Sequence, residues 1–276
     1  MIPDYDFTVG NTITIAVAIY KNNLKQFLKL SLAAHLWLLI PVYGWARYFA
    51  IAAWISKLSL NQLLDREDSL EKKKYFTIRS LFLFFVSALI NIFIVLLSWF
   101  TVLFSFGLIA GLLEAVFDST TISNFLEEVE RQQGISYYIF ALSIILIFFI
   151  ISIFVHSIFF VSDLCLAIEK PNKLFSLIFN SYIQTKNSRL KLLKIILISF
   201  IASLSLYFSV YILYTLLSSV FNQLNLYKSE LFYYGIIVAY ILTSILANAF
   251  LLPFWQSIKA VTFDRLTNLE RKYSLR

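Results

Sequence analysis

Three ionisable side chains, His35, His156 and Asp163, lie within long apolar runs of the sequence, where charged groups are costly. His156 and Asp163 are seven residues apart, which on one helix separates them by two turns and about 10 Å. They could share a chain of water molecules but not a direct hydrogen bond. One interpretation is a path for protons or a polar substrate. We favour the other, in which Asp163 is hydrated near a membrane boundary and His156 bonds a neighbouring helix.

Two asparagines extend this set of polar residues. Asn91 and Asn248 also lie inside apolar runs, where an amide can hydrogen-bond between helices for about 0.6 to 2 kcal/mol. Helix packing is the favoured role, with ligand binding as the alternative. The candidate intramembrane polar site therefore comprises His35, Asn91, His156, Asp163 and Asn248.

Motifs of common catalytic and metal sites do not occur in the sequence. It has no Walker-type phosphate loop, no His-Glu-x-x-His helix and no Gly-x-Ser-x-Gly turn. Two histidines are too few for most His-based metal sites. The single cysteine, Cys165, excludes an internal disulfide and a paired-cysteine metal site. We therefore expect a protein that is not an enzyme and that binds no cofactor or metal.

Four cations, Lys186, Arg189, Lys191 and Lys194, follow an amphipathic stretch at residues 172–187. A nucleic acid is one partner for such a cluster. These cations border apolar runs, however, as positive charges do at the cytoplasmic ends of membrane helices. We expect them to contact anionic lipid headgroups, at about 1 kcal/mol per cation, and we expect no nucleic acid.

The helical spacing of residues 172–187 also predicts which side chains of this stretch face the membrane. The side chains expected to face lipid or the helical bundle are Leu174, Leu177, Ile178 and Tyr182. The side chains expected to face water are Asn180 and Gln184.

The composition places these elements in a bilayer. Of the 276 residues, 60% are hydrophobic and only 14% are charged, which is more apolar surface than one soluble domain can bury. A helix needs about 20 apolar residues to cross the hydrocarbon core. Several runs reach that length, so we expect an all-α fold, a polytopic transmembrane helical bundle with amphipathic surface helices.

A single integral membrane domain with six crossings is predicted over residues 1–276. The crossings lie near 25–40, 44–64, 80–104, 137–166, 192–217 and 231–255, and the surface helices at 8–22 and 172–187. The sequence PVYG at 41–44 predicts a tight turn between the first two crossings. The run 80–116 is interpreted as one tilted helix that extends beyond the membrane, with two shorter pieces as the alternative.

The distribution of positive charge predicts the orientation. With the N-terminus in the cytoplasm, six crossings leave only Arg47, Arg131 and Lys228 outside, so the other 20 of the 23 Lys and Arg residues lie inside. Both termini are then cytoplasmic. We expect a multi-pass protein of the bacterial cytoplasmic (inner) membrane, with a thylakoid membrane as the alternative.

The stretch AIEKPNKLFSLIFNSYIQTKNSRLKLL resembles a motif of the glycerophosphodiester phosphodiesterase membrane-domain family and the related YciC-like bacterial membrane proteins. The matching positions are Glu169, Ser181, Thr185, Lys186, Asn187 and Arg189. IYKNN at 19–23 is similar to the entry of the family's first crossing, and TFDRLTNLE to its closing segment. In the closing segment Arg265 and Leu266 stand in swapped order relative to the family. In the first stretch, Asn180 stands where the family has Arg before the motif's Ser.

This resemblance implies a bundle of about six helices with surface helices on the cytoplasmic side. It does not imply hydrolysis, because the family's phosphodiesterase chemistry belongs to a separate soluble domain. The His-Arg-Gly and Glu-x-Asp motifs of that domain do not occur here.

The favoured functional hypothesis is a non-catalytic membrane protein that organises or senses its membrane or assists the assembly of other membrane proteins. The expected partners are the lipid bilayer, anionic lipids in particular, and other membrane proteins. The alternative is a transporter of small molecules or ions that uses the polar residues inside the bundle.

Overall fold

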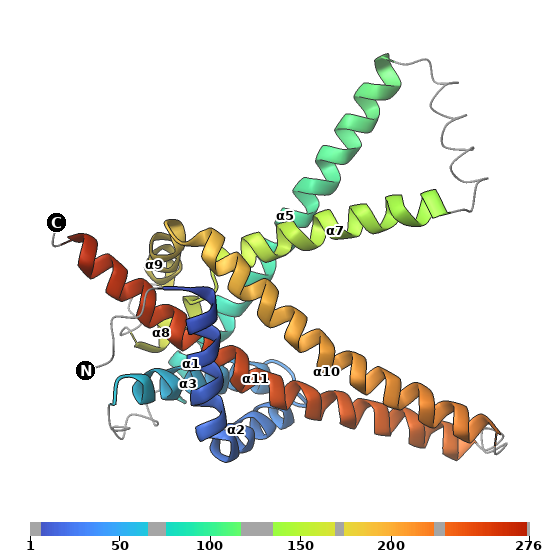
Figure 1. Ribbon diagram of the computed structural model, residues 1–276, viewed down its shortest axis with the longest axis horizontal. Coiled ribbons are helices and arrows are strands. Elements are labelled where there is room, and N and C mark those ends of the chain that lie inside the picture. Colours follow the sequence, from blue (N-terminus) through green and yellow to red (C-terminus); the bar gives the residue numbers. More distant parts are fainter. Residues whose placement is uncertain (1–6, 66–75, 117–134, 169–173, 224–229, 275–276) are drawn as a thin grey trace. The chain divides into compact units, whose positions relative to one another are not determined.

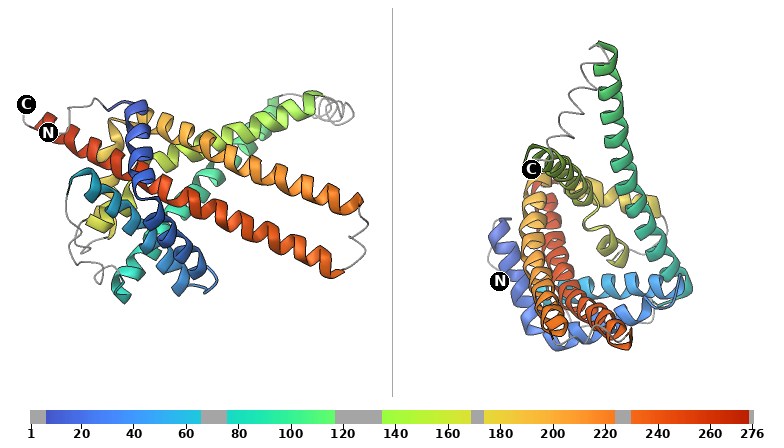
Figure 2. Two further views of the ribbon diagram at one scale, coloured as in Figure 1. Left: turned by 60° about the horizontal axis from the view of Figure 1, so that its bottom comes forward. Right: turned by 90° about the vertical axis from the view of Figure 1, so that its right-hand side faces the viewer.

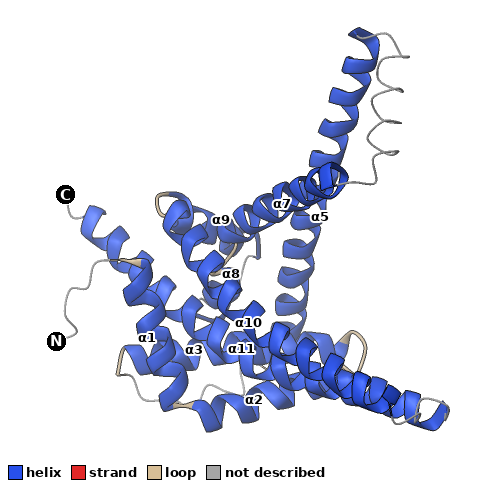
Figure 3. Ribbon diagram, turned by 45° about the vertical axis from the view of Figure 1, so that its right-hand side comes forward, coloured by secondary structure: helices blue, strands red, loops and turns tan. Residues whose placement is uncertain are grey.

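The computed structural model describes residues 7–65, 76–116, 135–168, 174–223 and 230–274 (Figure 1). Every secondary-structure element within these ranges is an α-helix, as Figure 3 shows. The predicted all-α fold is therefore confirmed for the described part of the chain. The helices are α1 (Val9–Asn22), α2 (Leu24–Trp37), α3 (Tyr43–Leu63), α5 (Ile78–Val116), α7 (Ile135–Ile158), α8 (Ser162–Ile168), α9 (Leu174–Lys186), α10 (Arg189–Gln223) and α11 (Glu230–Ser274).

Four helical segments in the described ranges are long and apolar enough to cross a membrane. They span Ile78–Thr101, Leu146–Ile168, Arg189–Val220 and Ile237–Asn268. Most of the residues in each span are not buried inside the structure. Apolar side chains that face outward along a whole helix are typical of contact with lipid, so the chain has the character of a membrane protein.

The first two predicted crossings, 25–40 and 44–64, are not among these four spans. Helix α2 has only 14 residues, which gives a length of about 21 Å against a hydrocarbon core of about 30 Å. Helix α3 has 21 residues, but nearly all of its side chains from Ala50 to Leu60 are buried by other helices. An apolar run can be covered by protein as well as by lipid, and the sequence pattern does not distinguish the two.

The chain divides into two compact units, and α11 is central to the first, which comprises residues 1–88 and 159–276. In this unit α11 packs against α1, α2, α3 and α10. Figure 2 shows α10 and α11 running side by side. Helix α1 contributes Thr12, Ala16 and Ile19 as its buried face.

The described part of the second unit, residues 89–158, consists of the part of α5 that follows Ala88 and the whole of α7. The Trp99 indole N–H donates a hydrogen bond to Ser152 Oγ, and the Trp99 ring meets Phe148 edge-on at 6.1 Å between centroids. Helix α5 is continuous over 39 residues. The interpretation of 80–116 as one helix is therefore confirmed.

The predicted crossing 137–166 is not one continuous helix. Helix α7 ends at Ile158 and α8 begins at Ser162, with a turn at residues 159–161 between them. His156 and Asp163 therefore belong to different helices, which corrects the expectation that they lie two turns apart on one helix face. Neither Pro nor Gly occurs at this turn, so the sequence carries no conventional signal for it.

The predicted turn at 41–44 is present between α2 and α3, and it depends on two residues. Val42 adopts a positive φ of 60°. Gly44 is already helical, and its role is to allow close packing, because a Cβ atom there would lie 1.8 Å from the Trp37 carbonyl oxygen. The turn also brings Arg47 over the Trp37 ring at 4.3 Å.

We expect Gly44→Ala to lower the free energy of unfolding by about 1 to 3 kcal/mol, because the added methyl group forces the α2–α3 turn apart. Thermal unfolding of the purified chain in detergent measures the loss. Gly10→Ala is the matched control, since nothing lies within 4 Å of a Cβ at that position. Equal melting temperatures for the Gly44→Ala variant and the unaltered chain would contradict the packing.

Candidate functional site

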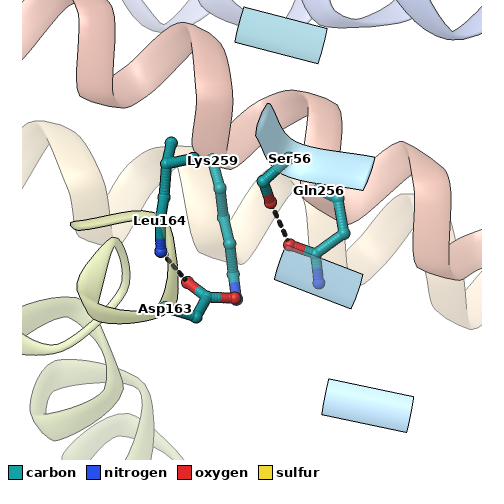
Figure 4. Close-up of polar contacts among 5 residues, drawn as sticks. All are labelled: Ser56, Asp163, Leu164, Gln256 and Lys259. Atoms are coloured by element: carbon teal, nitrogen blue, oxygen red, sulfur yellow. Dashed lines mark hydrogen bonds and ion pairs between the residues drawn. The ribbon is translucent and has the colours of Figure 1, made fainter. Parts of the chain in front are cut away.

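An ion pair between Asp163 and Lys259 joins α8 to α11 within the first unit (Figure 4). Lys259 Nζ lies 2.7 Å from Asp163 Oδ2, and the two side chains are only 15% and 24% exposed, respectively. Asp163 Oδ1 also accepts a hydrogen bond from the Leu164 backbone N–H at 3.0 Å. Asp163 lies in the first turn of α8, where the helix dipole favours a carboxylate.

Four polar side chains form a second group between α3 and α11, which we call the α3–α11 seam: Ser56, Ser59, Gln256 and Ser257. Ser56 Oγ donates to Gln256 Oε1 (Figure 4). Ser59 Oγ and Ser257 Oγ lie 3.2 Å apart. All four residues are buried. Their hydrogen bonds satisfy polar groups that would otherwise be costly in an apolar interior.

Sequence reasoning missed the α11 members of both groups. Lys259 is the only charged residue in the sequence between Glu230 and Asp264, and this isolation was a usable signal. Gln256 carried no such signal, because an uncharged polar residue just after a predicted crossing such as 231–255 is common.

Two of the predicted polar residues, His35 and Asn248, each contact a tyrosine of a neighbouring helix, Tyr48 on α3 and Tyr207 on α10, respectively. His35 is buried, its Nδ1 lies 2.8 Å from the Ser31 carbonyl oxygen, and its ring meets Tyr48 edge-on at 5.3 Å.

Asn248 connects α10 to α11. Its Oδ1 accepts a hydrogen bond from the Tyr207 hydroxyl, and its Nδ2 donates to the Ser244 carbonyl at 2.9 Å. The prediction that Asn248 hydrogen-bonds between helices is confirmed.

The other two predicted residues belong to the second unit. Asn91 is half-buried on α5, and His156 is exposed near the end of α7. Asp163, in the first unit, pairs with Lys259. The five predicted residues therefore take part in separate local contacts.

The four predicted lipid-contacting cations surround the junction between α9 and α10. Lys186, Lys191 and Lys194 are exposed, whereas Arg189 is half-buried. The Arg189 guanidinium lies 4.7 Å from the centre of the Tyr182 ring, and its hydrogen bond to the Tyr182 hydroxyl lowers the pKa of that hydroxyl.

Exposed apolar side chains accompany these cations. Leu190 is 75% exposed, and Ile183 and Leu197 are exposed as well. Lys191 Nζ lies 5.4 Å from the centre of the Phe7 ring, so the beginning of α10 adjoins the residues that precede α1. The junction therefore presents both charge and apolar surface.

Tyr182 is exposed, and its contact with lipid or the bundle stays a prediction, whereas the expected orientation is wrong for Gln184. Gln184 is half-buried, and its Oε1 accepts a hydrogen bond from Cys165 Sγ at 3.6 Å. Asn180 is also half-buried and not fully exposed to water. The side chains of Leu174, Leu177 and Ile178 lie outside the described part of the structure.

No group of three or more His, Cys, Asp or Glu side chains suitable for a metal ion occurs among the described residues. Searches against protein-family models, curated proteins and solved structures found no match to this chain.

The ion pair can be tested by a double-mutant cycle. We expect Asp163→Asn and Lys259→Gln each to lower the free energy of unfolding by about 1 kcal/mol, a value reduced from that of a fully buried pair because both groups are partly exposed. The double variant is expected to lose less than the sum, because neither charge is then left alone. Unfolding in mixed micelles measures the cycle, and additive losses would show that the two side chains do not interact.

Proposed function

We propose that the chain is a non-catalytic integral membrane protein that holds anionic lipid at its cytoplasmic face, and that it thereby organises or senses the membrane or assists membrane-protein assembly. The observation that carries this proposal is the α9–α10 junction, where exposed cations lie beside exposed apolar side chains.

Such a surface suits the boundary between headgroups and acyl chains. Lys186, Lys191 and Lys194 can reach phosphate groups, while Ile183 and Leu190 enter the apolar layer. Each cation near an anionic surface contributes about 1 kcal/mol, so three of them favour anionic over neutral lipid substantially.

The proposed topology has six crossings with both termini in the cytoplasm of a bacterial inner membrane. The four long spans support four of these crossings. In this proposal α3 provides another, and α2 provides the first together with the turn that follows it to Ile40, about 17 residues, which is the lower limit for a crossing. The bias of Lys and Arg toward one side sets the orientation.

Reporter fusions that are active only outside the cytoplasm test the topology. Fusions after Ser119 and Asn225 are expected to be active, and a fusion after Asn172 inactive; all three sites lie outside the described residues. The reverse pattern would overturn the orientation. Inactivity after Asn225 alone would show that the number of crossings is wrong.

Lipid selectivity tests the proposed surface. We expect the triple replacement of Lys186, Lys191 and Lys194 by Gln to abolish most of the preference for spin-labelled phosphatidylglycerol over phosphatidylcholine in reconstituted bilayers. The triple replacement by Arg keeps three cations and is expected to keep the preference. If the Gln variant retains full selectivity, these side chains are not the lipid contact.

Transport of a small molecule or ion is the second candidate function, and the observation that favours it is that His35 and Asn248 each contact a tyrosine of a neighbouring helix. Polar residues inside membrane helices commonly mark substrate or proton paths. Uptake into sealed liposomes that is lost in His35→Ala and Asn248→Ala, but kept in His156→Ala, would support this class. Absence of uptake across a broad panel of substrates would count against it.

A further inference from the structure

Two arginines on neighbouring helices, Arg189 and Arg265, lie at the same end of the α10–α11 pair. The two helices are antiparallel, because Trp255 donates to Ser203 at 3.1 Å and Tyr207 bonds Asn248. Continuing these two contacts toward the start of α10 places Arg265 level with residues 190–193, within about one helical turn of Arg189. Leu192 and Leu266 are almost completely buried, so both helices remain packed within the unit at this level.

Each arginine keeps buried nitrogen atoms without a hydrogen-bond partner, although Arg189 also bonds the Tyr182 hydroxyl. Arg265 is only 8% exposed, and its Nη2 is buried without a hydrogen-bond partner. Arg189 Nε and Nη2 are likewise buried and unbonded. Neither side chain forms an ion pair with another residue in the described part of the chain. Buried guanidinium groups without an acceptor are costly, and two near each other also repel.

A further unbonded donor lies beside them. Thr262 is one turn before Arg265 on α11, is fully buried, and its Oγ1 has no hydrogen-bond partner among the described residues. Three side chains at one end of the α10–α11 pair thus offer donors, and no acceptor among the described residues uses them. The complementary ligand is an anion with several acceptor oxygens.

We propose that Arg189 and Arg265 bind the phosphate group of one anionic lipid. The planar fork of a guanidinium matches the oxygens of a phosphate, and two guanidinium groups can share them. A lipid is favoured over a free phosphate because Leu190, next to Arg189, is 75% exposed and offers contact to an acyl chain. This inference rests on the proposed function and deepens it, from a general attraction to anionic lipid to one defined headgroup site.

Binding can be measured on the full chain by native mass spectrometry after exhaustive delipidation in detergent. The probes are phosphatidylglycerol, phosphatidylcholine and inorganic phosphate. One phosphatidylglycerol is expected to bind each chain, with at least tenfold weaker binding of both other probes. Inorganic phosphate that binds as tightly as the lipid would overturn the assignment to a lipid, and equal binding of phosphatidylcholine would overturn the requirement for an anionic one.

Variants identify the side chains. Arg189→Gln and Arg265→Lys are expected to weaken phosphatidylglycerol binding about tenfold, because each loses part of the fork that grips the phosphate. Arg79→Gln removes the same side chain from an exposed position on α5 and is expected to change binding less than about twofold. Helix content and elution volume confirm folding. Should Arg265→Lys misfold, Arg189→Gln decides alone, since it alters a half-buried residue at a helix start.

Unchanged binding in Arg189→Gln would overturn the site. Failure of the arginine site is distinguishable from failure of the proposed function, because the triple Gln variant at Lys186, Lys191 and Lys194 leaves both arginines in place. That variant is expected to lose selectivity for bulk anionic lipid yet keep the single bound phosphatidylglycerol. Loss of both properties in the triple variant would contradict a separate arginine site.

Discussion

The close contact between α3 and α11 is the constraint on which the first unit depends. Ala50, Ala53 and Ser56 on α3 are completely buried, as are Ser257 and Ala260 on α11. Small side chains let two helix backbones approach closely, and in an apolar environment such packing together with interhelical hydrogen bonds holds helices together. The Ser56–Gln256 and Ser59–Ser257 contacts fix the register of this pair.

Once α11 is fixed against α3, it determines where the charged side chains of the unit lie. Its Lys259 meets Asp163 and so anchors the short helix α8 after the turn at residues 159–161. Six residues after Lys259 on α11, Arg265 lies at the level at which α10 begins. Asp163 thus neutralises Lys259, whereas Arg189 and Arg265 keep buried nitrogen atoms without a partner among the described residues, near the α9–α10 junction where the sequence also concentrates cations. This division of roles is the physical basis for assigning lipid binding to the junction.

The sequence predicted the features that follow from apolarity and hydrogen-bonding capacity. Long apolar runs predicted the helical fold and the continuous helix α5, and an amide inside an apolar run predicted the interhelical bond of Asn248. It could not show that α3 is covered by protein, because lipid and a protein interior select the same residues. It also missed the partner of Asp163. Lys259 lies four residues beyond the predicted crossing 231–255, where a side chain that extends to the membrane surface is expected, although its isolation among uncharged residues was a usable signal.

The central claim, that the chain holds anionic lipid, is tested most directly by the lipid that accompanies the protein out of its own membrane. The protein is extracted without added lipid, and the bound lipids are identified and compared with the composition of the whole membrane. The account predicts that anionic species are enriched severalfold over their membrane abundance and persist through washing at high salt. A bound fraction with the same composition as the surrounding membrane would contradict it.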